Sequence, residues 1–206
     1  MDINTEKIRK RYNRASRFYD LLESPMEIMS LREWRIDLIK ELKGKVLEVG
    51  VGTGKNIEHY LNDVDITAID FSEKMLERAK EKAEKYIKKV VLLQMDAQNM
   101  NFTDNTFDTV FTTCVYCSVP DPIKGLKEMR RVCKPNGQII MIEHVRSEKK
   151  VLGLIMDILN PIVVNIYGAN INRRTIENIY RSGFNNVKVD NLYSDIVKKI
   201  VIKNNK

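Results

Sequence analysis

The stretch KVLEVGVGTGKN, residues 45–56, decides the fold. A short apolar run rich in β-branched residues ends at Gly50, and two further glycines follow at alternate positions, Gly52 and Gly54. The apolar run predicts a buried strand. Glycines in this arrangement let the backbone turn sharply and approach another molecule closely. The stretch therefore predicts a ligand-binding turn between a first strand and the element that follows it.

Strand-like and helix-like segments alternate through the rest of the chain. We expect strands at 45–50, 66–70, 90–95, 107–114 and 138–145, helices at 55–62, 72–87 and 121–133, and a turn at 134–137. A helical stretch at about 172–182 precedes two strands, 187–193 and 196–203, which are close enough to form a hairpin. The pattern predicts an α/β fold: a doubly wound, Rossmann-like sheet of seven strands, mostly parallel, with an antiparallel C-terminal edge hairpin strand.

The spacing of the glycines tests three classes of ligand. A phosphate-binding P-loop requires four residues between its glycines and a Ser or Thr after the lysine, whereas here Asn56 follows Lys55. A dinucleotide-binding loop requires G-x-G-x-x-G, and Lys55 occupies the place of the third glycine. The P-loop is excluded, and the dinucleotide alternative, an NAD-dependent oxidoreductase, is weakened.

The remaining pattern, E-x-G-x-G-x-G over residues 48–54, resembles the first motif of class I S-adenosylmethionine-dependent methyltransferases. Further motifs follow in the order and spacing of that family: Asp70 after the second strand, an Asp96-Ala97 pair after the third, FTDNTFDTV at 102–110 and EMRRVCKPNG at 128–137. In the last motif Cys133 replaces the usual leucine and Asn136 replaces a glycine.

The resemblance implies the roles of individual residues. On this resemblance, we expect S-adenosylmethionine as the cofactor and S-adenosylhomocysteine as the product. The glycine loop would hold the amino-acid half of the cofactor, Asp70 the ribose hydroxyls, and Asp96 the adenine amino group. The full set expected to bind the cofactor is Glu48, Gly50, Gly52, Thr53, Gly54, Asn56, Asp70, Phe71, Met75, Asp96, Ala97 and Thr113.

The N-terminal segment bears on the substrate. RYNRASRFYDLL, residues 11–22, resembles the opening of quinone-biosynthesis and phospholipid N-methyltransferases. A helix that includes this segment would gather Ile8, Tyr12, Ala15, Tyr19 and Leu22 on one apolar stripe, with lysines and arginines largely away from it. Such a basic amphipathic helix would lie on an anionic membrane surface or would close over the cofactor as a lid, and both can hold together. We therefore expect residues 1–30 to form an amphipathic lid helix.

Motifs in the second half of the chain also suggest an acceptor. The Cys-Ser-Val of residues 117–119, the Glu-His-Val of 143–145 and the Gly-x-Asn-x-x-Arg of 168–173 resemble membrane-associated thiol methyltransferases. An apolar insertion at about 147–171 would help to line the acceptor pocket. Catalytic candidates are Tyr19 and His144, the latter as a general base because its unperturbed pKa is near neutrality. The expected substrate pocket contains Tyr12, Tyr116, Cys117, Arg146 and Tyr167.

The composition of the chain limits the class of protein and its location. The chain has 206 residues, three cysteines and a net charge of +7, so residues 31–206 suit a single domain in a reducing cytoplasm. No apolar run is long enough to cross a membrane, no secretory signal is expected, and no zinc or redox site is expected at Cys114 and Cys117. We expect a cytoplasmic methyltransferase, peripheral at the inner membrane face, acting on a phospholipid amine, a small thiol or a quinone-type ring carbon. Nucleic acid is not an expected partner, and a non-catalytic membrane-binding module on the same fold is the second rival.

Overall fold

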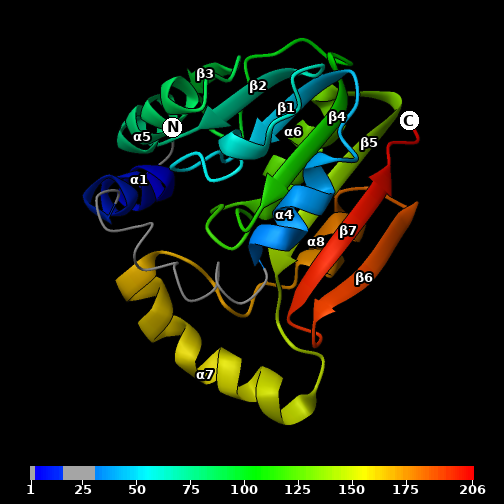
Figure 1. Cartoon of the computed structure of the whole chain (residues 1–206). Helices are drawn as coiled ribbons and strands as arrows, with labels where there is room; N and C mark the ends of the chain where they lie inside the picture. Colours follow the sequence, from blue (N-terminus) through cyan, green and yellow to red (C-terminus); the bar gives the residue numbers. More distant parts are fainter. Residues whose placement is uncertain (1–2, 16–30) are drawn as a thin grey trace.

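A seven-stranded sheet forms the centre of the molecule (Figure 1). A computed structural model of the chain describes residues 3–15 and 31–206. The strand order is β3-β2-β1-β4-β5-β7-β6. The strands are β1 (Lys45–Val49), β2 (Asp65–Asp70), β3 (Val91–Gln94), β4 (Phe107–Thr113), β5 (Cys133–His144), β6 (Val187–Tyr193) and β7 (Val197–Lys203). The first five strands pair parallel with one another, which confirms the predicted doubly wound α/β sheet.

The C-terminal hairpin completes the sheet in an order that its sequence alone does not specify. β7 pairs antiparallel with both β5 and β6. It is therefore the second strand from the edge, and β6 is the edge strand. β7 can take this inner place because Val197, Ile200 and Ile202 are buried, whereas β6 alternates exposed and half-buried side chains.

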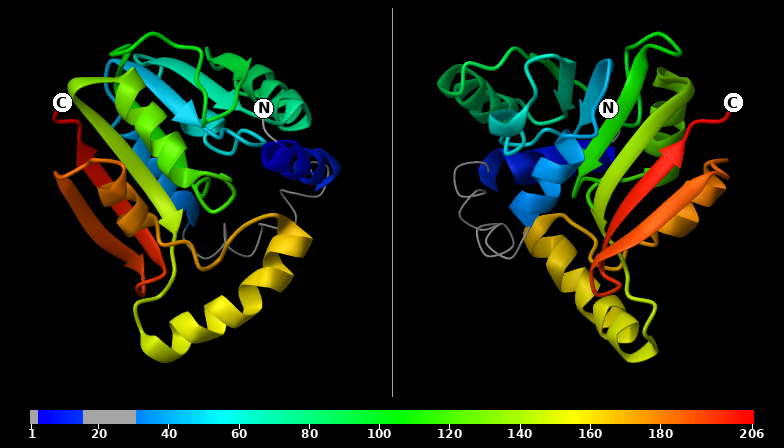
Figure 2. Two further views of the ribbon diagram at one scale, coloured as in Figure 1. Left: turned by 180° about the vertical axis from the view of Figure 1, so that it is seen from behind. Right: turned by 45° about the vertical axis from the view of Figure 1, so that its right-hand side comes forward.

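Helices cover both faces of the sheet (Figure 2). On one face lie α4 (Arg32–Ile39) and α5 (Glu73–Lys85), which pack Leu38, Ile39 and Ala79 against the sheet. On the other face lie α6 (Pro122–Val132) and α8 (Thr175–Arg181), which contribute Leu126 and Ile179 to the second half of the core. Apolar side chains on both faces of the sheet are thereby removed from water.

Side chains cap the starts of two helices. The Ser72 hydroxyl accepts the backbone N–H of Met75 at the start of α5, and Asp121 likewise caps α6, whose first residue is a proline. The predicted end of α5 was two residues too late. Ile87 has a φ of 52° and is 90% exposed, so it lies outside the helix and its apolar face.

Two local predictions were wrong. The helix expected at 55–62 is only a 3₁₀ turn, η2 (Ile57–His59), because Tyr60 leaves the turn with extended backbone and buries its ring beside Glu48. The turn expected at 134–137 lies inside β5. The register moves from Phe107–Cys133 to Thr109–Gln138, so these four residues bulge opposite a single residue of β4.

Two helices lie outside the layers, beyond the sheet: α1 (Ile3–Ala15) and α7 (Lys150–Tyr167). All views place α1 beside the C-terminal end of α7 (Figures 1 and 2), and Arg11 donates to the carbonyl of Val164 at 2.7 Å. The predicted apolar insertion is thus mainly one 18-residue helix. Within 3–15 and 31–206, no helix has the length and apolar character needed to cross a bilayer.

Candidate functional site

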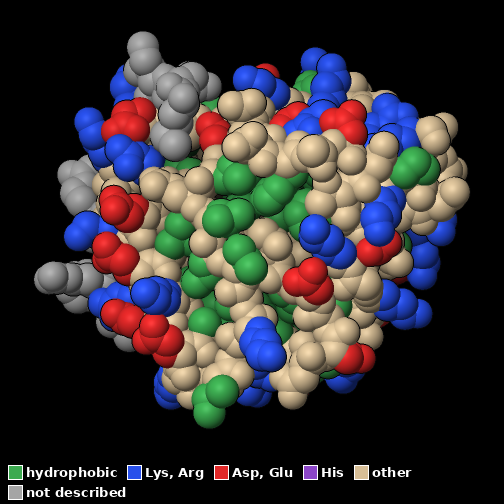
Figure 3. All heavy atoms as spheres, turned by 90° about the horizontal axis from the view of Figure 1, so that it is seen from above, with side chains coloured by type: hydrophobic (Ala, Val, Ile, Leu, Met, Phe, Trp, Pro, Cys, Tyr) green, Lys and Arg blue, Asp and Glu red, His purple; other side chains and the backbone are tan. Residues whose placement is uncertain are grey.

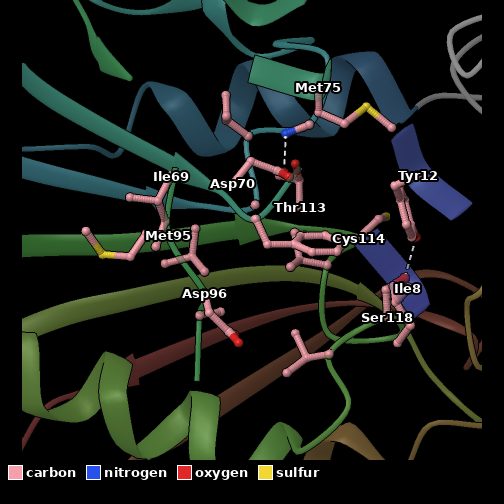
Figure 4. A pocket seen from close by; sticks show the side chains of 18 of the residues that line it. Ile8, Tyr12, Ile69, Asp70, Met75, Met95, Asp96, Thr113, Cys114 and Ser118 are labelled. Carbon is pink, nitrogen blue, oxygen red and sulfur yellow. Dashed lines mark hydrogen bonds between the residues drawn. The ribbon is translucent and has the colours of Figure 1, made fainter. Parts of the chain in front are cut away.

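One cavity lies where β1, β2 and β4 end (Figure 4). The space within it, counted out to its open mouth, is about 870 Å³. Helix α1 covers it, and in Figure 4 Ile8 and Tyr12 of that helix lie at the opposite end from Ile69 and Met95. The cavity is lined by Thr5, Ile8, Tyr12, Arg35, Val49–Thr53, Lys55, Ile69–Phe71, Met75, Met95–Ala97, Thr113–Val115 and Ser118–Pro120.

The three glycines of the loop have different surroundings. All three have positive φ, from 55° at Gly52 to 80° at Gly54. A Cβ on Gly50 would lie 2.5 Å from Val115, and one on Gly54 would lie 2.9 Å from the Cα of Ala79. A Cβ on Gly52 would meet no atom within 4 Å. Gly50 and Gly54 are therefore required by packing, whereas Gly52 leaves a bare backbone open to the cavity.

A buried polar network supports this loop from behind. Glu48 is 1% exposed and accepts hydrogen bonds from the Asn56 amide, at 2.7 Å, and from the Tyr60 hydroxyl. Arg35 of α4 donates to Thr113 at 3.0 Å and to Asn56 at 3.3 Å. Burial raises the pKa of Glu48 to about 7. The network fixes the strand end and the loop relative to β4 and α4.

Asp70 stands at the end of β2 and faces the glycine loop. Its Oδ2 accepts the N–H of Gly52 at 2.9 Å, and its Oδ1 accepts the N–H of Ser72 at 2.8 Å. The side chain is 5% exposed, and burial raises its pKa to about 6. Each carboxylate oxygen can accept a further hydrogen bond, so a ligand hydroxyl in the cavity would find a charged acceptor already held in place.

Asp96 follows β3 on the other side of the cavity floor. Its side chain accepts hydrogen bonds from the backbone and side chain of Gln98. Gln98 is 3% exposed, donates to Thr5 of α1 and accepts from the N–H of Asp121. One buried amide therefore joins the loop after β3, the covering helix and the start of α6.

Helix α1 is fastened over the cavity by side-chain contacts. The hydroxyls of Tyr12 and Ser118 are hydrogen-bonded, as Figure 4 shows, and the Tyr12 ring packs edge-on against Phe71 at 5.6 Å. The Ser72 hydroxyl donates to Asn13 at 2.6 Å. The described part of the predicted apolar stripe, Ile8 and Tyr12, therefore faces the cavity.

The loop after β4 is held by residues far along the chain. The carbonyl of Cys117 accepts the N–H of Asn170 at 2.8 Å and hydrogen bonds from the side chains of Asn170 and Arg173. Glu143 of β5 is 0% exposed and accepts the backbone N–H groups of Val115 and Tyr116. Burial raises the pKa of Glu143 to about 7. These contacts set the position of the cavity wall that carries Ser118.

The structure brings most of the predicted cofactor residues together. All of them line the cavity except Glu48 and Asn56, which lie in the network behind the loop, and Gly54, which packs against α5.

The predicted acceptor residues are more dispersed. Tyr12 lines the cavity, but Tyr116 is 0% exposed and its hydroxyl bonds to the sulfur of Met129, so placing Tyr116 in the pocket was wrong. Arg146 is paired with Asp157 of α7 at 2.8 Å, in a separate cleft, so that placement was also wrong.

The remaining candidates do not meet at the cavity. His144 and Cys117 are not among the described residues that line it. Burial lowers the pKa of His144, which is consistent with a neutral imidazole at the end of β5. Tyr19 and the side chain of Tyr167 lie outside the described residues.

Sequence reasoning missed several residues of the site. Arg35 is buried in a helix whose sequence shows only charged and apolar residues in alternation. Gln98 and Ser118 follow motif residues, but their partners on α1 are about a hundred positions away. The Gly-x-Asn-x-x-Arg motif at 168–173 was a usable signal, because its asparagine and arginine hold the loop beside the cavity.

The cavity fits the parts of S-adenosylmethionine. The open backbone at Gly52 suits the amino-acid moiety, Asp70 suits the ribose hydroxyls, and Asp96 with the apolar Ile69, Met75 and Met95 suits an adenine ring. A pyrophosphate would need a helix N-terminus after the loop. Here the loop leads into a three-residue 3₁₀ turn. The fold and the site together define the class: a methyltransferase domain of the kind that uses S-adenosylmethionine.

Comparison with known proteins gives the same class. Residues 47–141 match the family described as the methyltransferase domain, so this part of the chain is a methyltransferase domain and the predicted family is confirmed.

Individual relatives differ in what they methylate. A phosphatidylethanolamine N-methyltransferase of Cereibacter sphaeroides is 44% identical over 108 residues, which is 52% of this chain and 53% of the relative. A demethylmenaquinone methyltransferase of Staphylococcus aureus is 36% identical over 148 residues, 68% of this chain and 61% of the relative. The matches thus span between about half and three fifths of these curated relatives. The crystal structure of a SAM-dependent methyltransferase from Thermotoga maritima has a TM-score of 0.70, with 21% identity, 94% of this chain and 99% of that chain covered.

Proposed function

We propose that this chain transfers the methyl group of S-adenosylmethionine to the headgroup amine of a phospholipid. The observation that carries the proposal is the cavity in which the bare backbone of Gly52, the fixed carboxylate of Asp70 and the Asp96 loop converge beneath α1. The choice of acceptor draws on the phosphatidylethanolamine N-methyltransferase, the relative with the higher identity of the two. The apolar cover of the cavity, Ile8, Tyr12 and Val119, suits a lipid-like acceptor rather than a highly charged one.

The chain's own contribution is alignment and exclusion of water. When bound, S-adenosylmethionine supplies a methyl group activated by the sulfonium, and transfer to an amine leaves S-adenosylhomocysteine and releases a proton from the nitrogen. Asp70 and the glycine loop would hold the donor so that its methyl group points toward the end of the cavity closed by Tyr12 and Ser118. Positioning of this kind supplies much of the barrier reduction in a displacement between two bound reactants. We assign no general base.

The covering helix serves as a lid in this proposal. The lid prediction covered residues 1–30, and the contacts of the described part, α1, support it. Tyr12→Phe removes the hydroxyl that bonds to Ser118 while keeping the ring against Phe71. We expect it to weaken S-adenosylhomocysteine binding about five- to tenfold, because one hydrogen bond is worth roughly 1 kcal/mol. Tyr180→Phe, at a half-exposed tyrosine of α8, is the matched control. Equal affinity in both variants would contradict the lid.

A ring carbon of a quinone precursor is the second candidate acceptor. The relative named demethylmenaquinone methyltransferase is similar over more of this chain than the phospholipid enzyme is. A small thiol remains a third chemistry, based on the motif resemblance alone. All three acceptors are apolar or membrane-borne, so we also propose that the enzyme works at a membrane surface.

The decisive experiment supplies the full chain with radiolabelled S-adenosylmethionine and three acceptors separately: vesicles containing phosphatidylethanolamine, a reduced quinone, and a panel of alkyl thiols. We expect label in the phospholipid, identified by mass as the N-methyl product. If label appears only in the quinone or only in a thiol, the proposed acceptor is wrong but the protein is still a methyltransferase. Calorimetric titration with S-adenosylhomocysteine and NADH tests the class itself. Binding of NADH without S-adenosylhomocysteine would favour an oxidoreductase, and donor binding without transfer to any acceptor would favour a non-catalytic module.

A further inference from the structure

Helix α7 carries an apolar stripe on its outer face. Along 150–167 the exposed large side chains recur at intervals of three and one, which places them on one side of an α-helix. Their exposed fractions run from 44% at Leu159 to 74% at Val151. The stripe consists of Val151, Leu154, Ile155, Ile158, Leu159 and Ile162. It holds more than half of the exposed large hydrophobic side chains in the described part of the chain.

The stripe faces outward because polar side chains fix the rotation of the helix. Asp157 points toward the domain and forms a bidentate pair with Arg146, with N–O distances of 2.8 and 3.0 Å. The same carboxylate accepts from Asn172 at 3.0 Å, and one turn further Asn160 accepts the N–H of Ile171 at 2.9 Å. Turning the stripe inward would break these contacts and leave the more buried partner, the Arg146 guanidinium, without its carboxylate. The polar side of α7 therefore faces the domain and its apolar side faces solvent, which is the reverse of an ordinary surface helix.

We propose that the α7 stripe inserts into the headgroup region of an anionic lipid bilayer. A helix of 18 residues is about 27 Å long, and its apolar face can lie in the plane of the interface. The basic residues suit an anionic surface: Lys149 and Lys150 are exposed where the helix begins, and Lys7 and Lys10 are exposed on α1 beside its other end. No acidic side chain is among the exposed positions of α7.

The size of the stripe favours a bilayer over a second copy of the chain. A stable dimer buries about 800 Å² on each partner. Six side chains on one protruding helix supply less than this. Figure 3 views the molecule from above, on the side away from α7, and shows charged side chains of both signs around a group of hydrophobic ones. A bilayer needs only one convex apolar face. The exposed stripe supplies one, and α7 itself lies away from the sheet in both views of Figure 2.

The position of the stripe links the membrane to the site. The C-terminal end of α7 is bonded to α1 through Arg11 and Val164, and α1 covers the cavity. A bilayer on α7 would thus lie beside the covered mouth, where a lipid acceptor has to arrive. The apolar residues Ile8 and Tyr12 of α1 face the cavity. The proposed membrane contact therefore uses the stripe of α7 and not that of the N-terminal helix. The membrane contact itself is inferred from the exposed stripe. Only its role in bringing a lipid acceptor to the site rests on the proposed function.

Vesicle co-sedimentation of the full chain tests the proposal. Vesicles of phosphatidylglycerol and phosphatidylcholine should bind the protein, and Ile158→Glu should lower the partition coefficient at least tenfold, since burying one isoleucine supplies most of such a factor. Ile87→Glu is the matched control, because Ile87 is 90% exposed in the turn after α5 and should leave binding unchanged. Both variants should bind S-adenosylhomocysteine as the wild type does.

Three results would overturn the proposal: a wild type that does not sediment with the anionic vesicles, an Ile158→Glu variant that sediments like the wild type, or a dimer by analytical ultracentrifugation that Ile158→Glu dissociates. A failure of the proposed function looks different. In that case S-adenosylhomocysteine does not bind or no methyl group is transferred, while vesicle binding and its loss in Ile158→Glu are retained.

Discussion

Replacing Asp70 by asparagine tests the site at the residue on which most of its geometry depends. The two carboxylate oxygens accept different backbone donors, Gly52 on Oδ2 at 2.9 Å and Ser72 on Oδ1 at 2.8 Å. An asparagine has one carbonyl oxygen, so one of these N–H groups must face an amide NH₂ instead. The ribose hydroxyls would at the same time lose a charged acceptor. Asp70→Asn should therefore weaken cofactor binding without removing any apolar contact.

The magnitude follows from the kind of bond that is lost. A hydrogen bond to a charged group contributes about 1.5–3 kcal/mol, which corresponds to roughly 10- to 150-fold in affinity. We expect the dissociation constant for S-adenosylhomocysteine to rise within that range in Asp70→Asn. Asp65→Asn is the matched control, because Asp65 lies at the exposed opposite end of the same strand. Its affinity should equal that of the wild type.

Isothermal titration calorimetry with S-adenosylhomocysteine at pH 8 and pH 5 measures both affinity and its pH dependence. Burial raises the pKa of Asp70 to about 6, so the wild-type carboxylate takes up a proton as the pH falls through that value. The protonated group is a weaker acceptor, so wild-type affinity should fall toward pH 5, whereas the Asp70→Asn variant should lose this dependence. An Asp70→Asn variant that keeps the wild-type circular dichroism and binds within twofold of wild type would refute the reasoning.

Two further predictions concern stability. Gly50→Ala should lower the free energy of unfolding more than Gly52→Ala does. Both replacements place an alanine at a positive φ, which costs about 1–2 kcal/mol, but only at Gly50 would the new Cβ press against Val115. Guanidinium unfolding measures the free energy of unfolding of both variants. An equal decrease in the two would contradict the packing argument. Glu48 and Glu143 have pKa values raised by burial from 4.5 to about 7, so the folded state binds their protons more tightly than the unfolded state does. The free energy of unfolding should therefore fall as the pH rises from 5.5 to 8, by up to about 2 kcal/mol for each group. Unfolding curves that coincide at the two pH values would show that these carboxyl groups are better solvated than their burial indicates.

The parts of the fold that could be predicted are those that depend on residues close together in the sequence. β1, the glycine loop and Asp70 follow one another within 26 residues, and each is specified by its neighbours: an apolar run, a need for positive φ, and the end of a second strand. The caps at Ser72 and Asp121 are equally local. Such features depend on backbone geometry within a few residues, which a single sequence displays.

What could not be predicted depends on contacts between distant segments. Arg35 reaches Thr113 across 78 positions, and no periodicity in α4 marks it as part of a site. Tyr116 was expected in the pocket, but the strand end turns its ring into the core. The apolar insertion was expected to line the pocket, because hydrophobicity alone does not tell the inner face of a helix from the outer one. Asp157 and its partner Arg146 decide that question through a pair formed only in the folded chain.

The fastening of α1 has a kinetic consequence. The helix is bonded at Thr5, at Tyr12 and at Asn13 to three different loops around the cavity mouth, and its C-terminal half is bonded to α7. These bonds would slow the release of spent cofactor from beneath the helix. Turnover in the steady state would then be set by release of S-adenosylhomocysteine, so the first turnover should appear as a burst that outruns every later one.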